Sequence, residues 1–414
     1  MTLSDASTVL SMSYFPNLVT PGSTDAFGRL RVSNPFAIFD SKLIADNDPT
    51  HWDDQQISGA GTTSTWNANQ GSVTLAVANL TAGMRARQTF RRFTYQPGKS
   101  QLFTLTGILG APATGITRRI GAFDENNGVF FESGPTNVAV VVRTKTSGAV
   151  VDNRFTQAAW NYDKMNGAGP SGITLDFTKT QIFMIDFQWL GTGRVRFGFD
   201  VAGVFQLAHS VDHANLDTLV YTSTPNNPLR HEISNDGTGG VANMLQICAG
   251  VISEGGLDTT GTVRAVSRGI APFVTANNNN LFPLFAIRVR SGYEGANVRP
   301  VRFSAVVTST ADIEVQLLLN PTVAGTALAF TAITGSVVEA DVATTNASTG
   351  VTGGTLLASS TANASIGEIS LESPSDYQLG VTIAGVRDIL VLAVRRLTGG
   401  AETFYGGLNW REVF

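Results

Sequence analysis

The chain has 414 residues, of which 14% are charged, and its formal net charge at pH 7 is -4. An average soluble protein carries roughly 25% charged residues, so uncharged polar residues and glycine, or partner molecules, must keep this surface in solution. The low positive charge argues against nonspecific nucleic-acid binding. The single cysteine, Cys248, excludes an internal disulfide framework and a thiolate metal cage.

Residues 1–50 predict an extended N-terminal arm, because prolines interrupt them and no apolar residue recurs with the period of a strand or helix. Large apolar groups in such a segment need cover from solvent. We expect the arm to lie against a neighbouring subunit, with the chain's own β domain as the alternative cover. The residues expected to carry this assembly role are Phe27, Arg29, Arg31, Phe36 and Phe39.

Residues 51–256 predict a first β domain, because apolar residues recur at every second position between clusters of Gly, Asn, Asp and Pro. Within it, Pro97 to Ser100 reads "PGKS", which ends like a phosphate-binding loop. Such a loop also needs a glycine where Phe93 stands and a helix after it, whereas strand-like alternation follows here. The sequence therefore predicts a turn, and we expect no nucleotide and no other cofactor.

The turn-rich segment 157–172 carries Trp160 and Tyr162 among polar residues. Aromatic side chains in such a segment are typical of sugar-binding loops and also of subunit interfaces. We therefore predict that Trp160 and Tyr162 contact a glycan or a neighbouring subunit, and the subunit is the favoured partner.

Residues 181–210 predict a three-stranded meander with one aromatic face and one polar face. Phe183, Ile185 and Phe187 alternate with polar residues, and Phe197 and Phe199 do so in the next strand. A slip of one residue moves every side chain of a strand to the other face of the sheet. We therefore predict loop lengths that place apolar residues opposite apolar residues. The expected pairs are Phe187–Phe197 and Phe197–Leu207, with three-residue loops at 191–193 and 201–203.

The candidate catalytic residues of the sequence are histidines and carboxylates. His209 and His213 share a strand face, but two ligands are too few for a catalytic metal centre, so we expect no metal and a half-buried His209. A glycosidase needs two carboxylates, and the sequence leaves such a pair open. The carboxylates near predicted strands are Glu132, Asp186 and Asp200, of which Asp186 is expected to form a diagonal ion pair with Arg196. No nucleophile elbow is present, and we expect no catalytic residue.

The rest of the chain predicts a linker at 257–280, which is rich in asparagine, and a second β domain at 281–414. Residues 345–365 predict a long, nearly uncharged loop or edge region within that domain. Cys248, in "MLQICAGVI", is expected to be a buried, unpaired thiol. No apolar run approaches the length of a membrane span, so we expect no membrane partner. The predicted fold class is all-β, with two antiparallel β-sandwich or jelly-roll domains after the arm.

The segment "TDAFGRLRVSNPFAIFDSK", Thr24 to Lys42, resembles the N-terminal signature of a family of tailed-phage and large-DNA-virus proteins, mostly virion structural proteins. Further stretches are similar to that family. They are "YQPGKSQLFTLTG", "GPSGITLDFTKTQIFMIDFQWLGTGRVRFG", "QICAGVISEGG" and the terminal "LNW". The likeness covers the predicted first domain well and the second loosely. The predicted meander also resembles a concanavalin-like jelly roll, which keeps a lectin function open.

The resemblance implies a non-enzymatic virion structural protein of the capsid or tail, assembled as a homo-oligomer. Its expected partners are copies of itself and other virion proteins, and its expected location is the virion, assembled in the host cytoplasm. The alternative is an adhesin of the virus particle that binds a host-surface glycan. A polysaccharide-degrading spike enzyme is a third, more distant alternative.

Overall fold

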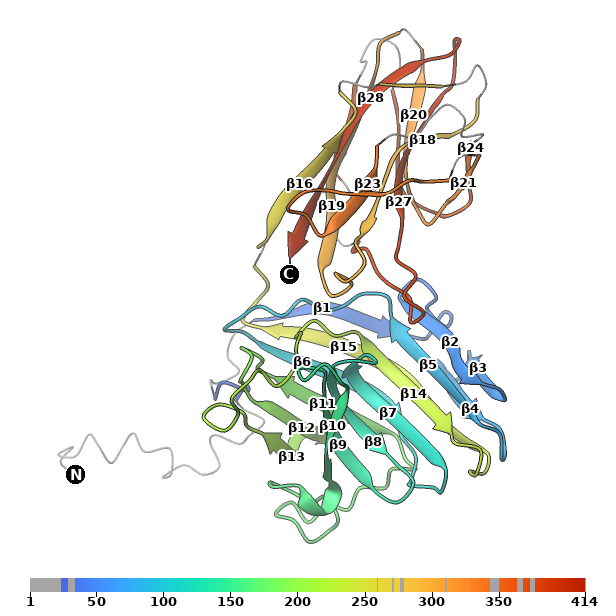
Figure 1. The fold of residues 1–414 in the computed structure, drawn as a ribbon. Helices are drawn as coiled ribbons and strands as arrows, with labels where there is room; N and C mark the ends of the chain where they lie inside the picture. Colours follow the sequence, from blue (N-terminus) through green and yellow to red (C-terminus); the bar gives the residue numbers. More distant parts are fainter. Residues whose placement is uncertain are drawn as a thin grey trace, which may run out of the picture. The chain divides into compact units, whose positions relative to one another are not determined.

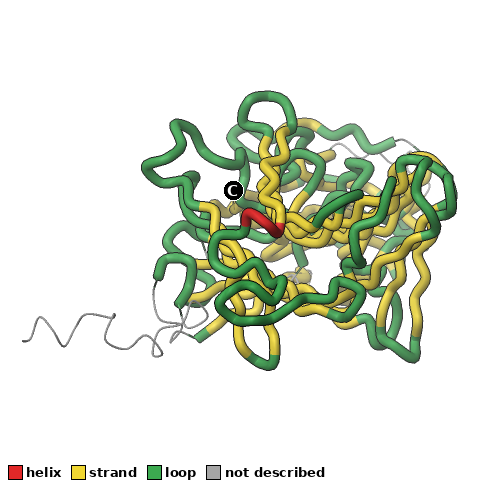
Figure 2. The backbone as a smooth tube through the Cα atoms, turned by 90° about the horizontal axis from the view of Figure 1, so that it is seen from below, coloured by secondary structure: helices red, strands yellow, loops and turns green. Residues whose placement is uncertain are grey.

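The structure of the protein is a computed structural model. It describes residues 24–28, 34–258, 260–269, 272–275, 279–309, 311–325, 327–342, 350–362, 368–372 and 377–413. These residues form strands and connecting loops, with one 3-10 helix, η3 (Gln157–Ala159), drawn in red in Figure 2. No helix of this described part is long and apolar enough to cross a membrane. The predicted all-β fold class with antiparallel sandwiches is confirmed.

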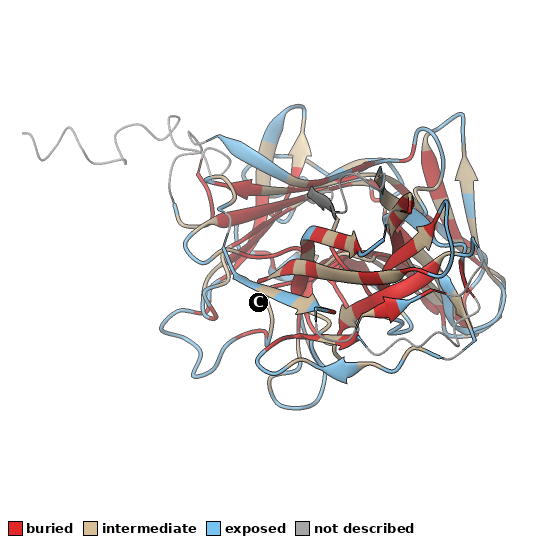
Figure 3. Ribbon diagram, turned by 90° about the horizontal axis from the view of Figure 1, so that it is seen from above, coloured by how far each residue is buried: buried red, intermediate tan, exposed pale blue. Residues whose placement is uncertain are grey.

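The chain divides into two compact units. Unit 1 consists of the described parts of Met1–Thr89 and Tyr95–Asp258, and unit 2 of the described parts of Phe90–Thr94 and Thr259–Phe414. In Figure 1, most of unit 1 runs from blue to yellow-green and unit 2 from yellow to red. Buried residues follow the strands in both units (Figure 3).

Unit 1 is a sandwich of two antiparallel sheets. Within the described residues the first sheet has eight strands. In spatial order they are β13 (Val204–Val211), β12 (Val195–Val201), β11 (Gln181–Phe187), β6 (Ser100–Ile108), β15 (Ala242–Glu254), β4 (Ser72–Val77) and β3 (Thr62–Asn67), with β1 (Pro35–Lys42) paired to β15.

The second sheet of unit 1 has seven strands within the described residues. In spatial order they are β10 (Val151–Thr156), β9 (Val138–Thr144), β8 (Gly128–Ser133), β7 (Ile116–Phe123), β14 (Leu229–Asn235), β5 (Gly83–Thr89) and β2 (Trp52–Gly59). The two sheets meet face to face. The ring of Phe131 on β8 lies 5.2 Å from Phe183, 5.5 Å from Phe197 and 5.1 Å from Phe199 between ring centroids.

The predicted inner faces of β11 and β12 are confirmed, but the predicted register between these two strands is wrong by two residues. Phe187 pairs with Val195, and Ile185 pairs with Phe197. The loop is longer than three residues, because the Gln188 N–H still donates to the Arg194 carbonyl at 2.9 Å. A shift of two residues keeps every side chain on its face, so alternation could not detect it.

The loop between β12 and β13 has two residues, Ala202 and Gly203, instead of the predicted three. Both have positive φ, 55° and 79°, as a tight hairpin turn of this kind requires. The register then slips at Ala208, so Phe197 pairs with His209 and not with the predicted Leu207. The two-residue turn thus sets Phe205 and Leu207 outward, and the β-bulge returns His209 to the inner face.

Part of the predicted arm is a strand of unit 1 itself. β1 pairs with β15 over its whole length, from Pro35 opposite Glu254 to Lys42 opposite Cys248. Phe39 is buried and lies edge-on to Trp52, with ring centroids 6.4 Å apart. The expectation that this stretch needs a neighbouring subunit for cover is therefore wrong from β1 onward.

Unit 2 is also a β-sandwich. Its five-stranded sheet has the order β16 (Thr262–Ser267), β28 (Thr403–Val413), β19 (Asn297–Val307) and β26 (Glu368–Glu372), with β17 (Phe273–Val274) paired to β28. Its six-stranded sheet has the order β22 (Thr331–Ala332), β23 (Val338–Asp341), β18 (Phe282–Val289), β27 (Leu390–Arg396), β20 (Ile313–Leu319) and β25 (Thr355–Ala362). A two-stranded sheet pairs β21 (Thr322–Ala324) with β24 (Gly350–Thr352). These strand counts refer to the described residues.

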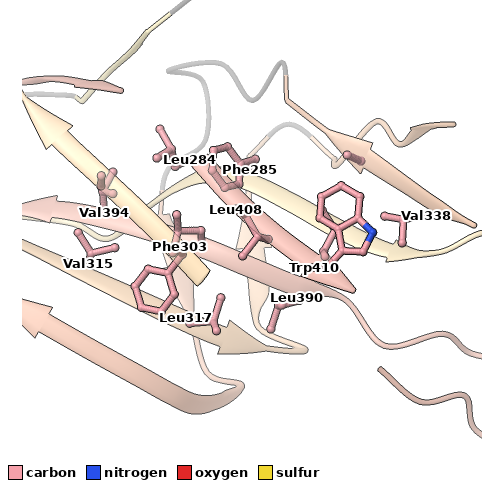
Figure 4. Close-up of a cluster of buried hydrophobic side chains, with 14 of the residues drawn as sticks. Leu284, Phe285, Phe303, Val315, Leu317, Val338, Leu390, Val394, Leu408 and Trp410 are labelled. Carbon is pink, nitrogen blue, oxygen red and sulfur yellow. The ribbon is translucent and has the colours of Figure 1, made fainter. Parts of the chain in front are cut away.

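The core of unit 2 lies between its two larger sheets. Trp410 and Phe303 from the five-stranded sheet face Leu390 and Val315 from the six-stranded sheet (Figure 4). β16 and β17 lie within the predicted linker 257–280, so much of that linker is sheet. β25, within the predicted loop or edge region 345–365, is an edge strand of the six-stranded sheet.

Candidate functional site

The outer face of the eight-stranded sheet, which points away from the seven-stranded sheet, carries half-buried side chains in two rows. In the first row, Ile182 on β11 lies between Thr106 on β6 and Asp200 on β12. In the second row, Met184 lies between Thr104 and Gly198 on the same strands. Because residues two apart on a strand share a face, both rows face away from the core.

Phe205 extends this outer face onto β13. It pairs with Asp200 and is half-buried. A Cβ atom on Gly198 would lie only 2.5 Å from the Phe205 ring, which shows that the ring lies across the bare backbone of Gly198. Glycine is needed at this position for close approach of the ring. The result is an aromatic ring that contacts the sheet over Gly198 and is partly open to solvent.

A pocket of about 650 Å³ opens on the first row and is lined by Asp200. Phe205 does not line the pocket itself but pairs with Asp200 on the next strand. The walls of the pocket are the segment 173–182 and the hairpin 200–203. A volume of this size is within the range of roughly 300–1,000 Å³ that small-molecule sites occupy. The polar lining consists of Thr106, Thr174, Asp176, Lys179, Thr180, Gln181 and Asp200, and the apolar lining includes Ile173, Leu175, Ile182 and Val201.

The charges of the pocket are partly satisfied by their own loops. The Thr178 hydroxyl and N–H donate to Asp176 at 2.5 and 2.9 Å, and these hydrogen bonds lower the pKa of Asp176. Asp200 accepts the Gly203 N–H at 3.0 Å in the hairpin turn. Both carboxylates thus stiffen the pocket walls and keep a free oxygen for a ligand.

The predicted ion pair of Asp186 with Arg196 is confirmed, although the two residues lie directly opposite and not diagonally. They form a third row on the same outer face, where Asp186 is 0% and Arg196 4% exposed. The Ser100 hydroxyl also donates to Asp186, at 2.7 Å, and Arg196 donates to the backbone carbonyl of Thr24. Asp186 is therefore committed to structure.

Glu132 is brought next to a second carboxylate, Glu232, on the outer face of the seven-stranded sheet. Arg119 lies between them and donates to Glu132 at 2.8 Å and to Glu232 at 2.6 Å. Burial works to raise the pKa of Glu132, but hydrogen bonds and charge from Arg154 and Arg119 outweigh it, so the pKa is lowered. At Glu232, burial also works to raise the pKa, but the charges and hydrogen bonds of Arg230 and Arg119 outweigh it, so this pKa is lowered as well.

This pair belongs to a ladder of alternating charges that crosses the seven-stranded sheet. A general acid needs a raised pKa, and neither Glu132 nor Glu232 has one. The arrangement therefore joins strands and does not resemble a poised acid and base. The members of this ionic ladder, in spatial order, are Arg143, Asp152, Arg154, Glu132, Arg119, Glu232 and Arg230.

The two predicted contact aromatics differ in exposure. Trp160 is 3% exposed, and its indole N–H donates to the Phe155 carbonyl at 3.1 Å. Its ring lies 6.1 Å from Phe199, so it is a core residue and cannot contact a glycan or a subunit. Tyr162 is 46% exposed and is free to do so.

Of the predicted assembly residues, Phe27 is half-buried, Phe36 is 46% exposed and Phe39 is buried. Arg29 and Arg31 lie outside the described residues. Exposed Phe36 is thus the member of the set whose side chain is most available to a neighbour.

The histidines do not form a metal site. His209 is on the inner face as predicted, and burial lowers its pKa to about 4 against the opposing charge of Asp212. His213 bonds Asp217 at 2.7 Å and stacks on Tyr221 with ring centroids 4.0 Å apart. Within the described residues no group of three His, Cys, Asp or Glu side chains is placed to hold a metal ion.

Two smaller predictions can be compared with the structure. Pro97 to Ser100 is a turn, as predicted: the Lys99 N–H bonds the Gln96 carbonyl at 3.0 Å, Gly98 has φ 88°, and β6 begins at Ser100. Cys248 is unpaired but only half-buried, so its predicted full burial is wrong.

Sequence reasoning missed the pocket, the outward ring of Phe205 and the ionic ladder. The ladder had a signal, because an acidic and a basic residue stand two apart in two strands, Asp152 and Arg154 in "VDNRF" and Arg230 and Glu232 in "LRHEISN". The pocket had none, because its walls come from segments whose approach depends on loop lengths.

Comparison with known proteins places the fold but not the family. No protein-family model and no curated protein sequence matches the chain. Several solved structures are similar to about half of it. A glycoside hydrolase family protein from Mycobacterium thermorestibile is 13% identical, with a TM-score of 0.37 over 52% of this chain and 99% of that one. A β-1,3-glucanase from Mycobacterium marinum is 13% identical, with a TM-score of 0.36 over 52% and 98%.

The CBM2 module of Lactobacillus casei BL23 phage J-1 evolved Dit is 7% identical, with a TM-score of 0.36 over 55% of this chain and 99% of that one. At such identities the likeness concerns the fold, and the role of each residue has to be argued from its own surroundings.

The predicted function has to be corrected. The structures of similar fold include glycoside hydrolase family proteins and glucanases, and none of the three named above is described as a virion structural protein. The prediction of a non-enzymatic virion structural protein is therefore overturned, and the prediction that the chain is not an enzyme is overturned with it. The resemblance of Thr24 to Lys42 to a virus family, the expected partners and the expected location stay predictions.

Proposed function

We propose that unit 1 binds a neutral polysaccharide chain on the outer face of its eight-stranded sheet. The observation that carries this proposal is the pocket of about 650 Å³ beside Phe205. A sugar ring has an apolar C–H face and a rim of hydroxyl groups, so its site needs a flat apolar surface next to hydrogen-bonding side chains. Phe205 over Gly198 supplies the first, and the lining of the pocket supplies the second.

The charges of the pocket favour a neutral ligand. Among the described residues that line it, Asp176 and Asp200 are carboxylates, Lys179 is the single cation and arginine is absent. An anionic polymer would meet two negative charges against one positive charge, and arginine is the residue best suited to bind carboxylate or phosphate groups. Hydroxyl groups can instead donate to the carboxylates and accept from Thr174 and Gln181.

The sheet also offers a path for a chain longer than the pocket. The two rows run across the strands from Phe205 toward β6 and end on Thr106 and Thr104. Neighbouring strands are about 4.8 Å apart, so successive sugar units would meet successive strands. Ile182 and Met184 give the middle of this path an apolar floor.

The test is binding to a panel of soluble neutral polysaccharides, namely linear β-1,3-glucan, mixed-linkage β-1,3-1,4-glucan, xylan and mannan. We expect at least one to retard the protein in affinity gels and to bind in calorimetry. Phe205→Ala should weaken that binding by about tenfold, which corresponds to about 1.4 kcal/mol. Tyr293→Ala, which removes a 45% exposed aromatic of unit 2, is the control and should leave binding unchanged.

Reducing ends released from the same polymers would show that binding is coupled to hydrolysis. Asp200→Asn removes the charge of this side chain and keeps its shape, so it tests whether the Asp200 carboxylate takes part in hydrolysis. The proposal fails if no polymer of the panel binds, or if binding is unaffected by Phe205→Ala.

A further inference from the structure

Residues Thr24–Gly28, which we call the strap, form a turn held by its own residues. The Asp25 carboxylate accepts the Phe27 N–H at 2.9 Å, and the Asp25 carbonyl accepts the Gly28 N–H at 2.9 Å. Gly28 has φ 79°, a conformation that glycine adopts without a steric penalty. The strap therefore has a defined shape that its own sequence specifies.

The strap lies on the outer face of the eight-stranded sheet. Thr24, Asp25 and Ala26 are 9%, 4% and 2% exposed, and the Arg196 guanidinium donates to the Thr24 carbonyl. Arg196 and its partner Asp186 point outward from the sheet, and both are buried. Side chains on an outer face are buried only where something covers them, and the hydrogen bond to Thr24 places the strap over this pair.

The covered pair adjoins the proposed sugar path. The row of Asp186 and Arg196 is two residues along the strands from the row of Met184 and Gly198, which corresponds to about 7 Å. The segment 173–182 bounds the path on its other side, at the pocket. A sugar chain that follows the two rows thus has the strap along one edge and the pocket wall along the other.

We propose that the strap is a wall of the carbohydrate groove and restricts it to unbranched chains. This inference rests on the proposed function. A branch that projects in the plane of the sheet would meet the strap on one side or the segment 173–182 on the other. The anchored strap cannot give way without losing its bond to Arg196 and exposing the Asp186–Arg196 pair to solvent.

The experiment compares two truncations. Deletion of residues 1–28 removes the strap, whereas deletion of residues 1–23 keeps it and is the matched control. Each protein is titrated with linear β-1,3-glucan and with the same backbone carrying β-1,6 branches, and with linear mannan and its branched galactomannan form. Circular dichroism and melting curves establish that each protein is folded.

We expect the full chain and the 1–23 deletion to bind the linear polymer about tenfold tighter than its branched form. Deletion of 1–28 should bring the two affinities close together by strengthening binding of the branched form. If this deletion does not fold, Ala26→Arg dislodges the strap, because an arginine does not fit a site where the side chain is 2% exposed.

Two results would overturn the inference alone: equal binding of linear and branched polymer by the full chain, or an unchanged ratio after removal of the strap. Absence of binding to every polymer would overturn the proposed function and this inference with it. The two failures are therefore distinguishable.

Discussion

His231 is a neutral histidine held in the interior of unit 1. It is 0% exposed, and its ring centroid lies 5.6 Å from that of Trp52. Neither ring nitrogen has a hydrogen-bond partner among the described residues. Burial, and after it the charge of Arg87, lower the pKa of His231 to about 3. A proton on this ring would have no partner to stabilise it and would face a buried guanidinium.

We predict that His231 makes the protein less stable as the pH falls below about 6.5. The unfolded chain binds a proton at the ordinary histidine pKa of about 6.5, but the folded chain does not until about pH 3. The free energy of unfolding should therefore fall by up to about 1.4 kcal/mol per pH unit in this window. His209, whose folded pKa is about 4, acts in the same direction.

The measurement is denaturant unfolding between pH 4.5 and 8 for the natural protein and for His231→Leu. The variant cannot take up the proton in its unfolded state, so its stability should change with pH by about one proton less. Identical pH slopes for the two proteins would show that His231 is not held neutral.

The ionic ladder acts at the scale of the strand, because its seven side chains join five neighbouring strands of the seven-stranded sheet, β10, β9, β8, β7 and β14. Its central member, Arg119, is shared by Glu132 on β8 and Glu232 on β14, one on each side of β7. Burial lowers the pKa of Arg119, but the two carboxylates outweigh it and raise the pKa. The guanidinium is thus a charged link between three strands.

We predict that Arg119→Met lowers the free energy of unfolding at pH 7 by about 3 kcal/mol, because it leaves two buried carboxylates with one partner fewer each. Loss of Arg119 should raise the pKa of both glutamates, so the difference from the natural protein should shrink as the pH approaches 4. Both stabilities are measured by denaturant unfolding.

The control is Arg194→Met, which breaks an ion pair with Asp212 whose side chains are 40% and 48% exposed. An exposed pair of this kind contributes about 0–1 kcal/mol. Equal losses for the two variants would mean that the ladder contributes no more than an ordinary surface pair.

The faces of β11 and β12 could be predicted from this sequence, and their register could not. The inward side chains Phe183, Ile185 and Phe187 follow from alternation alone. A shift of two residues preserves that alternation, so alternation does not distinguish the predicted three-residue loop from the observed loop of five residues between Gln188 and Arg194. The tight turn at Ala202 and Gly203 requires positive φ at an alanine, which sequence rules disfavour.

The candidate site shows the same limit. Phe205 reads as an inward residue until the two-residue turn and the bulge at Ala208 are known. Trp160 reads as exposed because its neighbours are polar, yet its ring enters the core beside Phe199. The first error comes from the geometry of one hairpin and the second from a contact between segments far apart in sequence, and alternation encodes neither.

At the scale of the whole molecule, unit 2 is built from two separate stretches of the chain. Phe90–Thr94, which lies between two strands of unit 1 in sequence, belongs to unit 2. The Phe90 carbonyl accepts the Val381 N–H at 3.1 Å, and the Arg92 carbonyl accepts the Gln378 side-chain amide at 3.0 Å. Thr94 accepts a hydrogen bond from Asn297 at 2.5 Å, and Phe93 is 1% exposed.

We predict that a fragment of residues 259–414 folds but is less stable than unit 2 in the full chain. Without Phe90–Thr94 it loses three hydrogen bonds of about 1 kcal/mol each and leaves the peptide and amide groups of its own partners without acceptors. Calorimetry should show the fragment melting below the unit 2 transition of the full protein.

A peptide of residues 88–96 should raise the melting temperature of the fragment in a concentration-dependent way, because a ligand of the folded state stabilises it by mass action. The same peptide with Phe93→Ala, which lacks the buried ring, should do so at higher concentration only. If the fragment melts at the same temperature as unit 2 in the full chain and neither peptide changes that temperature, then Phe90–Thr94 does not stabilise unit 2.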